Sequence, residues 1–453
     1  MPAPRRRLLA DIAPLRDSAD FRRLYVGQLV SFLGSQLAVV AVPYQVFLLT
    51  RSSFQVGLVS LAQLGPLLVG SLVGGAVADR MDRRRLLMVM QVAQALTSAA
   101  LALNALHGLG ALWPIYVSTA VATALSGVDR PARSASVPNV VDRRQLAAAY
   151  ALWQILLQVG AVAGPALAGV LLARFSLALL YWLDALSFGA AFVTVGRMGP
   201  LPPGEPGRAG ADGDGAGADG DGAGAAPMLS GAPAPERPGR GRGSVFEGVR
   251  YAWRRQELIG VFVIDLDAMI FGLPRAVFPA LAQNVFRGGP ATYGLLSAAP
   301  GAGALVGALT TGWVASVRRQ GMAVIVAVAA WGATMTLFGA VTSLWLALLF
   351  LALAGAADVI SAVFRNTILQ TIVPDSLRGR LSALQIAVVS GGPRLGDAEA
   401  GAAAAVGGAR FAVVSGGVAC LAGVAAVAAW LPRFRSFETR PEPEGAQEAG
   451  RPT

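Results

Sequence analysis

Ionisable side chains interrupt the long apolar runs of this chain, and they are the residues best placed to do chemistry. Seven are carboxylates: Asp129, Asp184, Asp265, Asp267, Asp358, Asp397 and Glu399. Five are arginines: Arg130, Arg133, Arg275, Arg365 and Arg394. A charge at the centre of a membrane helix costs about 2.5 to 3.5 kcal/mol on insertion scales, so each needs a partner, a cavity or a proton. The pattern predicts ion pairs and proton-binding sites inside a membrane.

Two groups of acids are candidates for proton coupling. Asp265 and Asp267 lie shortly before a Gly and a Pro that can break a helix, and Asp397 and Glu399 follow a Gly-Gly-Pro sequence, with Arg394 nearby. Burial favours the protonated form of a carboxylate and a neighbouring Arg favours the charged form, so a mobile Arg can couple proton uptake to a conformational change. The alternative is a fixed salt bridge that holds helices together.

Sequence spacing also predicts ion pairs on single helix faces. Asp129 with Arg133, and Arg394 with Asp397, are three or four residues apart, which brings side chains together on a helix. Asp129, Arg133 and Arg365 lie toward the ends of their apolar runs, which favours a structural or gating role. Asp184 lies deeper, and both a polar contact between helices and a functional role stay open.

The composition limits the class of protein that can position these groups. Of the 453 residues, 55% are hydrophobic and 14% are charged, which leaves too few charges to coat soluble domains of this size. A single Cys and a single His exclude a disulfide framework and the usual Cys and His metal sites. Lys is absent, which removes the P-loop, so we expect that ATP hydrolysis by this chain does not supply the energy.

Apolar runs predict an all-α membrane protein with twelve transmembrane helices, because a helix needs about 20 residues to cross the hydrocarbon core. The predicted spans lie within Leu24–Thr50, Ser52–Ala78, Leu86–Val128 (two spans), Gln145–Ala173, Phe175–Gly196, Leu258–Phe286, Gly288–Val317, 320–373 (two spans), Leu381–Ala405 and Phe411–Leu431.

The arginines predict the orientation of these spans. The formal net charge is +11, yet only Arg51, Arg174, Arg287 and Arg410 lie in the odd-numbered connections. Because cationic loops stay in the cytoplasm, both termini should be cytoplasmic. The basic excess is therefore a signal of membrane topology, and we expect no nucleic-acid partner.

The chain also repeats itself. Gly160-x3-Gly164-x4-Gly169 recurs 232 residues later as Gly392-x3-Gly396-x4-Gly401, and Arg133 maps onto Arg365 at the same offset. Six spans per half in one orientation indicate a parallel repeat with a cavity between the halves. We predict an N-terminal six-helix bundle over 1–197, a flexible Gly/Asp/Pro-rich tether over 198–243, an amphipathic lead-in with a C-terminal bundle over 244–432, and a cytoplasmic tail over 433–453.

Two motifs carry a family resemblance. Between the second and third spans, the chain is similar to the signature Gly-x-x-x-Asp-Arg-x-Gly-Arg-Arg/Lys of the major facilitator superfamily. It matches at Gly75, Asp79, Arg80, Arg83 and Arg84 and departs from the signature at Asp82. The fifth span resembles the antiporter motif of that superfamily at Gly160, Gly164, Pro165 and Gly169, with Ala168 in place of one Gly. From the residues alone, the glycines would let neighbouring helices approach closely, Gly75 included.

Further segments, 129–133 with 146–149 and 363–367 with 374–380, resemble the branch that holds enterobactin-type siderophore exporters and macrolide efflux proteins. The resemblance covers about residues 20–432. It implies a gate built from the charged loop motif, which in the family stabilises the outward-facing state by contacts between the halves.

The resemblance implies a non-enzymatic exporter of the bacterial plasma membrane that works by alternating access. Its partners would be a small-molecule substrate, protons and the lipid bilayer, with no cofactor or metal, and it would act as a monomer. Export of a siderophore is favoured because buried arginines suit a catecholate anion. Multidrug or macrolide efflux is the alternative within transport, and a non-transporting membrane sensor is a remote one.

Overall fold

The computed structural model describes residues 11–78, 80–106, 110–201 and 250–438. Asp79, His107, most of the predicted tether and most of the predicted tail lie outside these residues. Within the described ranges the regular structure is helical, as the apolar runs predicted. Of the predicted lead-in, residues 250–253 are helical, and Ala252 is buried while Trp253 is 73% exposed.

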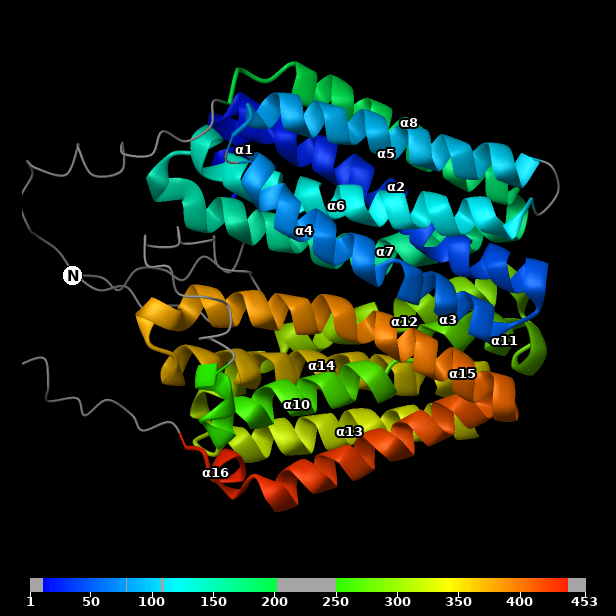
Figure 1. Ribbon diagram of the computed structural model, residues 1–453, viewed down its shortest axis with the longest axis vertical. Helices are drawn as coiled ribbons and strands as arrows, with labels where there is room; N and C mark the ends of the chain where they lie inside the picture. The colour runs from blue at the N-terminus through cyan, green and yellow to red at the C-terminus, as the bar shows by residue number, and fades with distance from the viewer. Residues whose placement is uncertain (1–10, 79, 107–109, 202–249, 439–453) are drawn as a thin grey trace, which may run out of the picture.

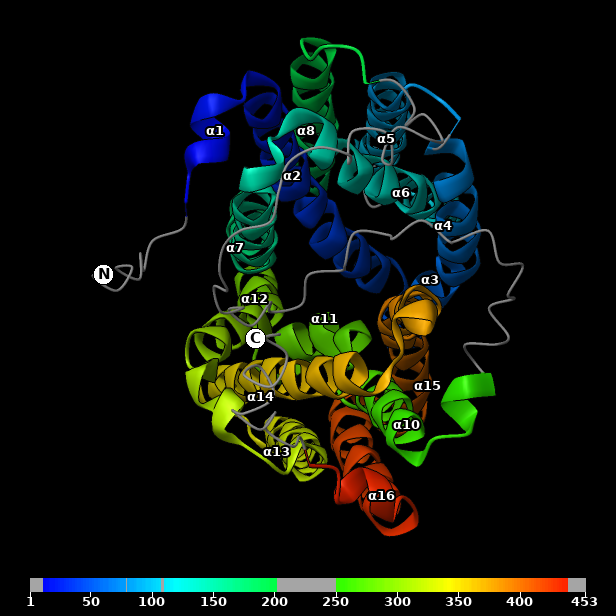
Figure 2. The same ribbon diagram turned by 90° about the vertical axis from the view of Figure 1, so that its left-hand side faces the viewer.

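The helices form two groups in space, one from each half of the chain (Figures 1 and 2). The N-terminal group holds α1 (Ala13–Asp17), α2 (Ala19–Thr50), α3 (Ser53–Ala62), α4 (Leu64–Ala78), α5 (Arg83–Leu106), α6 (Leu112–Val140), η1 (Arg143–Gln145), α7 (Leu146–Arg174) and α8 (Leu177–Gly196).

The C-terminal group holds α10 (Gln256–Phe271), η2 (Arg275–Val277), α11 (Phe278–Ala280), η3 (Leu281–Val285), α12 (Gly289–Leu309), η4 (Thr311–Ser316), α13 (Gln320–Ala340), α14 (Leu344–Ile372), α15 (Asp375–Trp430) and α16 (Pro432–Arg435).

Local sequence explains where several helices begin and end. The Ser18 and Ser52 hydroxyls accept the backbone N–H of Phe21 and Gln55, which caps the N-termini of α2 and α3. α10 ends at Phe271 with Gly272 as its C-cap, just before Pro274, so the break that these residues predicted is present. Gly408, with φ +84°, interrupts the long run of α15 in a conformation that favours glycine.

Nine helices among the described residues are long and apolar enough to cross a membrane. α15 accounts for two predicted spans in one helical run that is broken at Gly408. The predicted seventh span is divided between α10, which has 16 residues, and the short helical turns from η2 to η3. α6, the fourth predicted span, is too polar to count. The number twelve therefore stays a prediction.

The two groups meet along two helix pairs, α7 with α12 and α3 with α15. Small residues allow this approach. A Cβ on Gly169 would collide with the backbone of Gly294, and one on Gly401 would lie 2.7 Å from the Ser53 carbonyl oxygen. Buried residues from both groups contribute to one hydrophobic cluster. The repeated glycine motif therefore supplies part of the surface on which the groups touch.

Candidate functional site

The most deeply buried charges of the C-terminal group form an ion pair between two helices. Arg365 of α14 places NH1 2.8 Å from Oδ1 of Asp265 on α10, with side-chain exposures of only 5% and 3%. Asp358, two turns before Arg365 on α14, places its carboxylate 3.8 Å from NH2 of the same Arg. One guanidinium thus lies between two carboxylates. A change in the charge of either acid therefore changes the electrostatic attraction that holds α10 against α14.

Helix geometry separates the two predicted acids of α10. Asp265 points toward α14, whereas Asp267 lies against Cys420 and Gly423 of α15. Residues two apart on a helix do not share a face, so the two carboxylates serve different contacts. Cys420 is fully buried, as expected for a small apolar side chain, but it also contacts the Asp267 carboxylate.

Asp397 of α15 joins the two groups instead of pairing with Arg394. Its Oδ2 accepts a hydrogen bond from the Ser60 hydroxyl of α3 at 2.8 Å, and its Oδ1 accepts the Ala276 backbone N–H at 3.0 Å. Arg394 donates to the Ser390 carbonyl at 2.5 Å. The ion pair that their spacing predicted is not formed, because the α3–α15 crossing turns Asp397 toward Ser60.

Glu399 is half-buried, and no ion pair involves it among the described residues. Arg275 is exposed in η2 and acts electrostatically on both Asp358 and Asp397. Arg130 of α6 is exposed and acts on Arg394 across the two groups. Arg130 belongs to the N-terminal half and Arg275 to the C-terminal half, whereas the four acids predicted for proton coupling all belong to the C-terminal half.

In the N-terminal group, the predicted pair on α6 is present. Arg133 Nε lies 2.5 Å from Oδ2 of Asp129, four residues away, and both residues are buried. Arg133 and Arg365, which are equivalent in the repeat, lie in different groups, and each is paired within its own group. Spacing alone was enough to predict the first pair, but not the second.

The charged motif before α5 ties together helices of the N-terminal group. Arg83 NH1 donates to the Ala135 carbonyl at 2.7 Å, and Arg84 donates to the Gly196 carbonyl. Asp82, the departure from the family pattern, accepts the backbone N–H of Arg85 and of Leu201. Arg80 is exposed. Asp79 lies outside the described residues, so its predicted gating contact stays a prediction.

Gly75 does not mediate the close helix approach that the sequence predicted. A Cβ at Gly75 would meet no atom within 4 Å. The contact is made by Gly70 and Gly74, which pack on the backbone of α6 at Ala124 and Val128. The rotation of α4 decides this, because residues 70 and 74 share a face that residue 75 does not.

The glycines of α7 face two different helices. A Cβ on Gly160 would strike the ring of Phe32, and one on Gly164 the side chain of Gln36, both on α2. Gly169 faces Gly294 of α12, and the Pro165 carbonyl lies beside the same glycine. The predicted close packing is confirmed, and the motif links a helix of its own group to one of the other.

Sequence reasoning missed the contacts that join the two groups at one end. Arg51 NH1 donates to the Gln283 amide oxygen at 2.9 Å, and the Gln283 amide nitrogen donates to the Tyr44 hydroxyl at 3.1 Å. Tyr44 also stacks on Tyr293, with ring centroids 5.4 Å apart. The hydrogen-bond partners are more than 200 residues apart, so local spacing could not have indicated these contacts. Only a periodic pattern shared by both halves could have done so.

The profile of the family described as "Transmembrane secretion effector" matches residues 9–200 and 238–447. The chain belongs to this family. It is a transmembrane protein of the major facilitator superfamily, as its motifs indicated. Curated relatives named "Enterobactin exporter EntS", from Shigella boydii serotype 18 and Escherichia coli O1:K1, are each 28% identical over 391 residues and 86% of both chains.

Solved structures share the fold of this chain. The nucleoside transporter NupG (D323A mutant) has a TM-score of 0.69 at 11% identity and covers 92% of this chain and 99% of its own. A bacterial homologue of the iron transporter ferroportin, in an inward-facing state, has a TM-score of 0.67 at 14% identity and covers 91% and 99%. At such identities the likeness concerns the fold alone.

Proposed function

We propose that this protein exports a small molecule across the bacterial plasma membrane by alternating access, in exchange for protons, and that the substrate is of the siderophore type. The family and the named relatives support export. The basic side chains of both groups support an anionic substrate, because Arg275 and Arg394 belong to elements that contact α3 of the other half, and Arg130 acts electrostatically on Arg394. A guanidinium group binds paired anionic oxygens, such as those of a carboxylate, in a bidentate manner, and a catecholate presents two adjacent oxygens of this kind.

The proposed architecture is twelve spans in two parallel-repeat bundles, with both termini in the cytoplasm and a monomer as the working unit. The end that carries Arg51 and Gln283 is then the outer end. In this conformation the hydrogen bonds and stacked rings between the two groups at that end would hold the outer side closed. Opening outward requires these contacts, and the bond from Ser60 to Asp397, to break.

Proton coupling is proposed on one observation, the position of Arg365 between Asp265 and Asp358. Asp265 lies about 14 Å along α10 from Gln256, at 1.5 Å per residue, which places it inside the hydrocarbon. A proton on Asp265 would remove its attraction for Arg365, and the guanidinium could then move to Asp358, 3.8 Å away. Such a shift changes how α10 packs against α14, which is what a proton-driven cycle needs.

The test is efflux from proteoliposomes under an imposed pH gradient. Asp265→Asn keeps the side-chain shape but cannot titrate, so it should lower gradient-driven efflux about tenfold or more while substrate exchange continues. Wild-type efflux that ignores the pH gradient would refute proton exchange. Full gradient-driven efflux by Asp265→Asn would assign the coupling to another acid.

The substrate class has its own test. A catecholate siderophore, a cationic macrolide and a neutral analogue are compared as competitors for transport. The catecholate should compete best, and Arg275→Gln should weaken that preference. Preference for the macrolide that survives Arg275→Gln would favour the drug-efflux alternative instead.

A further inference from the structure

A buried acid of the N-terminal group has no role in the proposal above. Asp184 of α8 is 2% exposed and faces α5 and α2. Its Oδ2 accepts a hydrogen bond from the Ser98 hydroxyl at 2.6 Å, and its Oδ1 has no hydrogen-bond partner. Gly34 of α2 closes the site, because a Cβ there would lie 3.2 Å from Oδ1.

No cation compensates this carboxylate within the described residues. Among α2, α5, α7 and α8, the arginines lie near the helix ends: Arg22, Arg23, Arg83, Arg84, Arg85 and Arg174. Tyr181, the nearest titratable group on α8, donates to Gln45 at 2.6 Å rather than to Asp184. Burial with one hydroxyl donor and no counter-charge favours the protonated form of a carboxylate over the charged form.

Polar side chains lead from this acid toward the start of α5. Ser98, Gln94 and Gln91 recur at positions i, i−4 and i−7, on one face of the helix, and all three are buried. Both amide atoms of Gln91 and the Gln94 nitrogen lack a hydrogen-bond partner, as does the Gln28 oxygen of α2. Buried polar atoms of this kind can pass protons through intervening water, and Gln91 lies about 10 Å from Ser98 along the helix axis.

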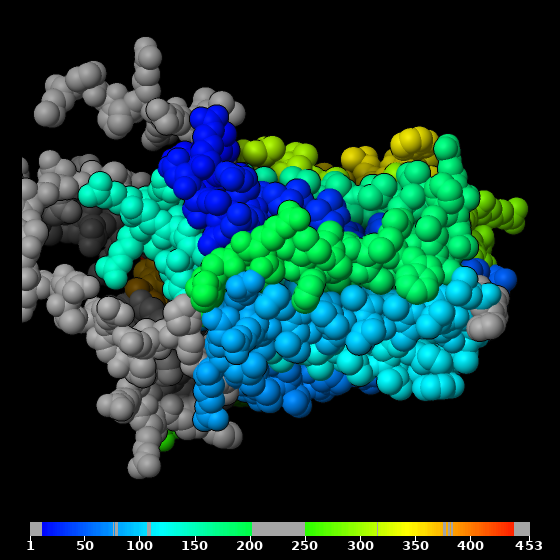
Figure 3. Space-filling view, turned by 90° about the horizontal axis from the view of Figure 1, so that it is seen from above, coloured from blue at the N-terminus to red at the C-terminus, as the bar shows by residue number. Residues whose placement is uncertain are grey.

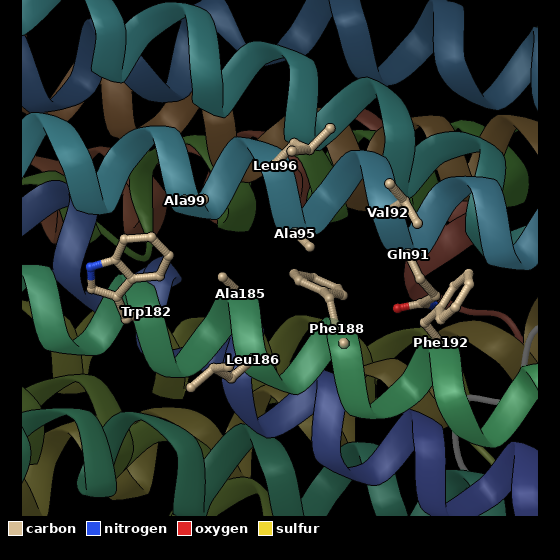
Figure 4. A pocket seen from close by; sticks show the side chains of 11 residues that line it. Gln91, Val92, Ala95, Leu96, Ala99, Trp182, Ala185, Leu186, Phe188 and Phe192 are labelled. Carbon is tan, nitrogen blue, oxygen red and sulfur yellow. The ribbon is translucent and has the colours of Figure 1, made fainter.

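Asp184, Ser98 and Gln94 are shielded from lipid. α5 and α8 lie side by side on the face that the N-terminal group turns away from the C-terminal group (Figure 3). An open groove between them is lined by apolar side chains such as Ala95, Ala185 and Phe188, and Gln91 is the polar residue among them (Figure 4). Leu186, in the same groove, is 67% exposed. Asp184 lies on the other side of this apolar layer.

We propose that Asp184 is a second proton-binding site of this transporter, inside the N-terminal group, reached from the cytoplasmic end along Gln91, Gln94 and Ser98. The carboxylate releases its proton along this row to water on the cytoplasmic side and is reprotonated from the outer side after the packing of α5 and α8 changes, so that one proton moves inward in each cycle. The site rests on the proposed proton exchange for its role in the cycle, but not for its ability to titrate.

Infrared difference spectroscopy on the purified full chain tests the titration without transport. The carbonyl band of a protonated carboxyl should appear as pH falls, persist in Asp265→Asn and vanish in Asp184→Asn. Ser98→Ala should shift the pH at which it appears, because it removes the hydroxyl donor to the charged form. Absence of a pH-dependent band that belongs to Asp184 would overturn the proposal. An Asp184 that stays protonated at every pH would be one such result.

Transport then tests the role in the cycle. Asp184→Asn should lower efflux driven by a pH gradient about tenfold or more and leave substrate exchange in place, while Leu186→Met, a lipid-facing control on the same helix, should match the wild type. Asp184→Glu, which can still titrate, should recover part of the loss. Gradient-driven efflux by Asp184→Asn at the wild-type level would overturn the role.

Two results separate this site from the proposed function. If the band titrates but wild-type efflux ignores the pH gradient, proton exchange fails and the titrating site stands. If a sodium gradient drives wild-type efflux and Asp184→Asn abolishes that response, the site holds a cation other than a proton and this proposal fails.

Discussion

Arg133 and Arg365 occupy equivalent positions in the two halves, yet their partners differ. Arg133 pairs with Asp129 four residues away on its own helix. Arg365 pairs with Asp265 on another helix and has Asp358 within 3.8 Å. The first pair moves with α6 as a unit and is insensitive to how α6 packs. The second pair holds two helices together, so only there does a change in charge alter helix packing.

The glycine contacts of the two halves, in contrast, are alike. Gly70 and Gly74 pack on α6 at Ala124 and Val128, and Gly303 and Gly307 pack on α14 at Ala352 and Ala356. The duplicated backbone has therefore kept its close helix crossings while the charges have diverged. This difference favours the C-terminal group as the half in which protonation of the acid paired with the arginine would change helix packing.

The largest expected difference comes from removing each arginine. Arg365→Ala leaves the buried Asp265 carboxylate, 3% exposed, and the partly exposed Asp358 carboxylate without a cation. Breaking a buried pair in this way costs about 3–5 kcal/mol, so thermal stability in detergent should fall sharply. Arg133→Ala leaves one carboxylate, with a side-chain exposure of 12%, and should cost less. Adding Asp265→Asn and Asp358→Asn to Arg365→Ala should restore stability. Equal losses for the two single variants would contradict the comparison.

A smaller difference is expected from replacing one acid beside each arginine, Asp358 beside Arg365 and Asp129 beside Arg133. Asp358→Asn removes the alternative position for Arg365, so both gradient-driven efflux and exchange should slow, by about three- to tenfold. Asp129→Asn should leave gradient coupling, measured as efflux with and without the pH gradient, close to wild type. A larger loss of coupling in Asp129→Asn would place the switch in the N-terminal group.

A matched pair of serines tests the contact between the groups. Ser60 bonds Asp397 across the interface at 2.8 Å, whereas its repeat equivalent Ser297 bonds the Tyr293 carbonyl of its own helix at 2.9 Å. Loss of one hydrogen bond is worth about 0.5–1.5 kcal/mol, so Ser60→Ala should raise the outward-open population about two- to tenfold. Ser297→Ala should not.

The measurement is labelling from outside of Ser53→Cys, which is 8% exposed at this interface, in a Cys420→Ala background. Faster labelling in Ser60→Ala than in Ser297→Ala is the expected result. Identical rates would mean that the Asp397 bond does not hold the outer side closed.

The smallest effects should come from Gly75→Ala and Gly312→Ala, since a Cβ at either position meets no atom within 4 Å. Alanine in place of glycine in a helix gains up to about 1 kcal/mol, so stability should stay the same or rise slightly. Gly74→Ala and Gly307→Ala should both destabilise, because their Cβ atoms would lie 2.6 Å and 2.9 Å from the neighbouring backbone. Thermal unfolding of the four variants checks this, and a loss in Gly75→Ala alone would restore a packing role to the motif.

The sequence by itself determined the helical class, most of the span positions, the break before Pro274 and the pair of Asp129 with Arg133. Each of these follows from local information: apolar length, backbone restriction by Pro and Gly, and the helical repeat. The duplicated glycine motif and the family resemblance were likewise visible in the order of residues.

Only the tertiary structure decided which way each helix turns its faces. That rotation paired Arg365 with Asp265, turned Asp397 toward Ser60 instead of Arg394, left Gly75 without a neighbour and placed Asp184 beside Ser98. Spacing along a helix states which side chains share a face, but the packing of helices distant in sequence determines what that face meets. The partners of a charge buried in a membrane protein are therefore set by helix packing, whereas its presence can be predicted from the sequence.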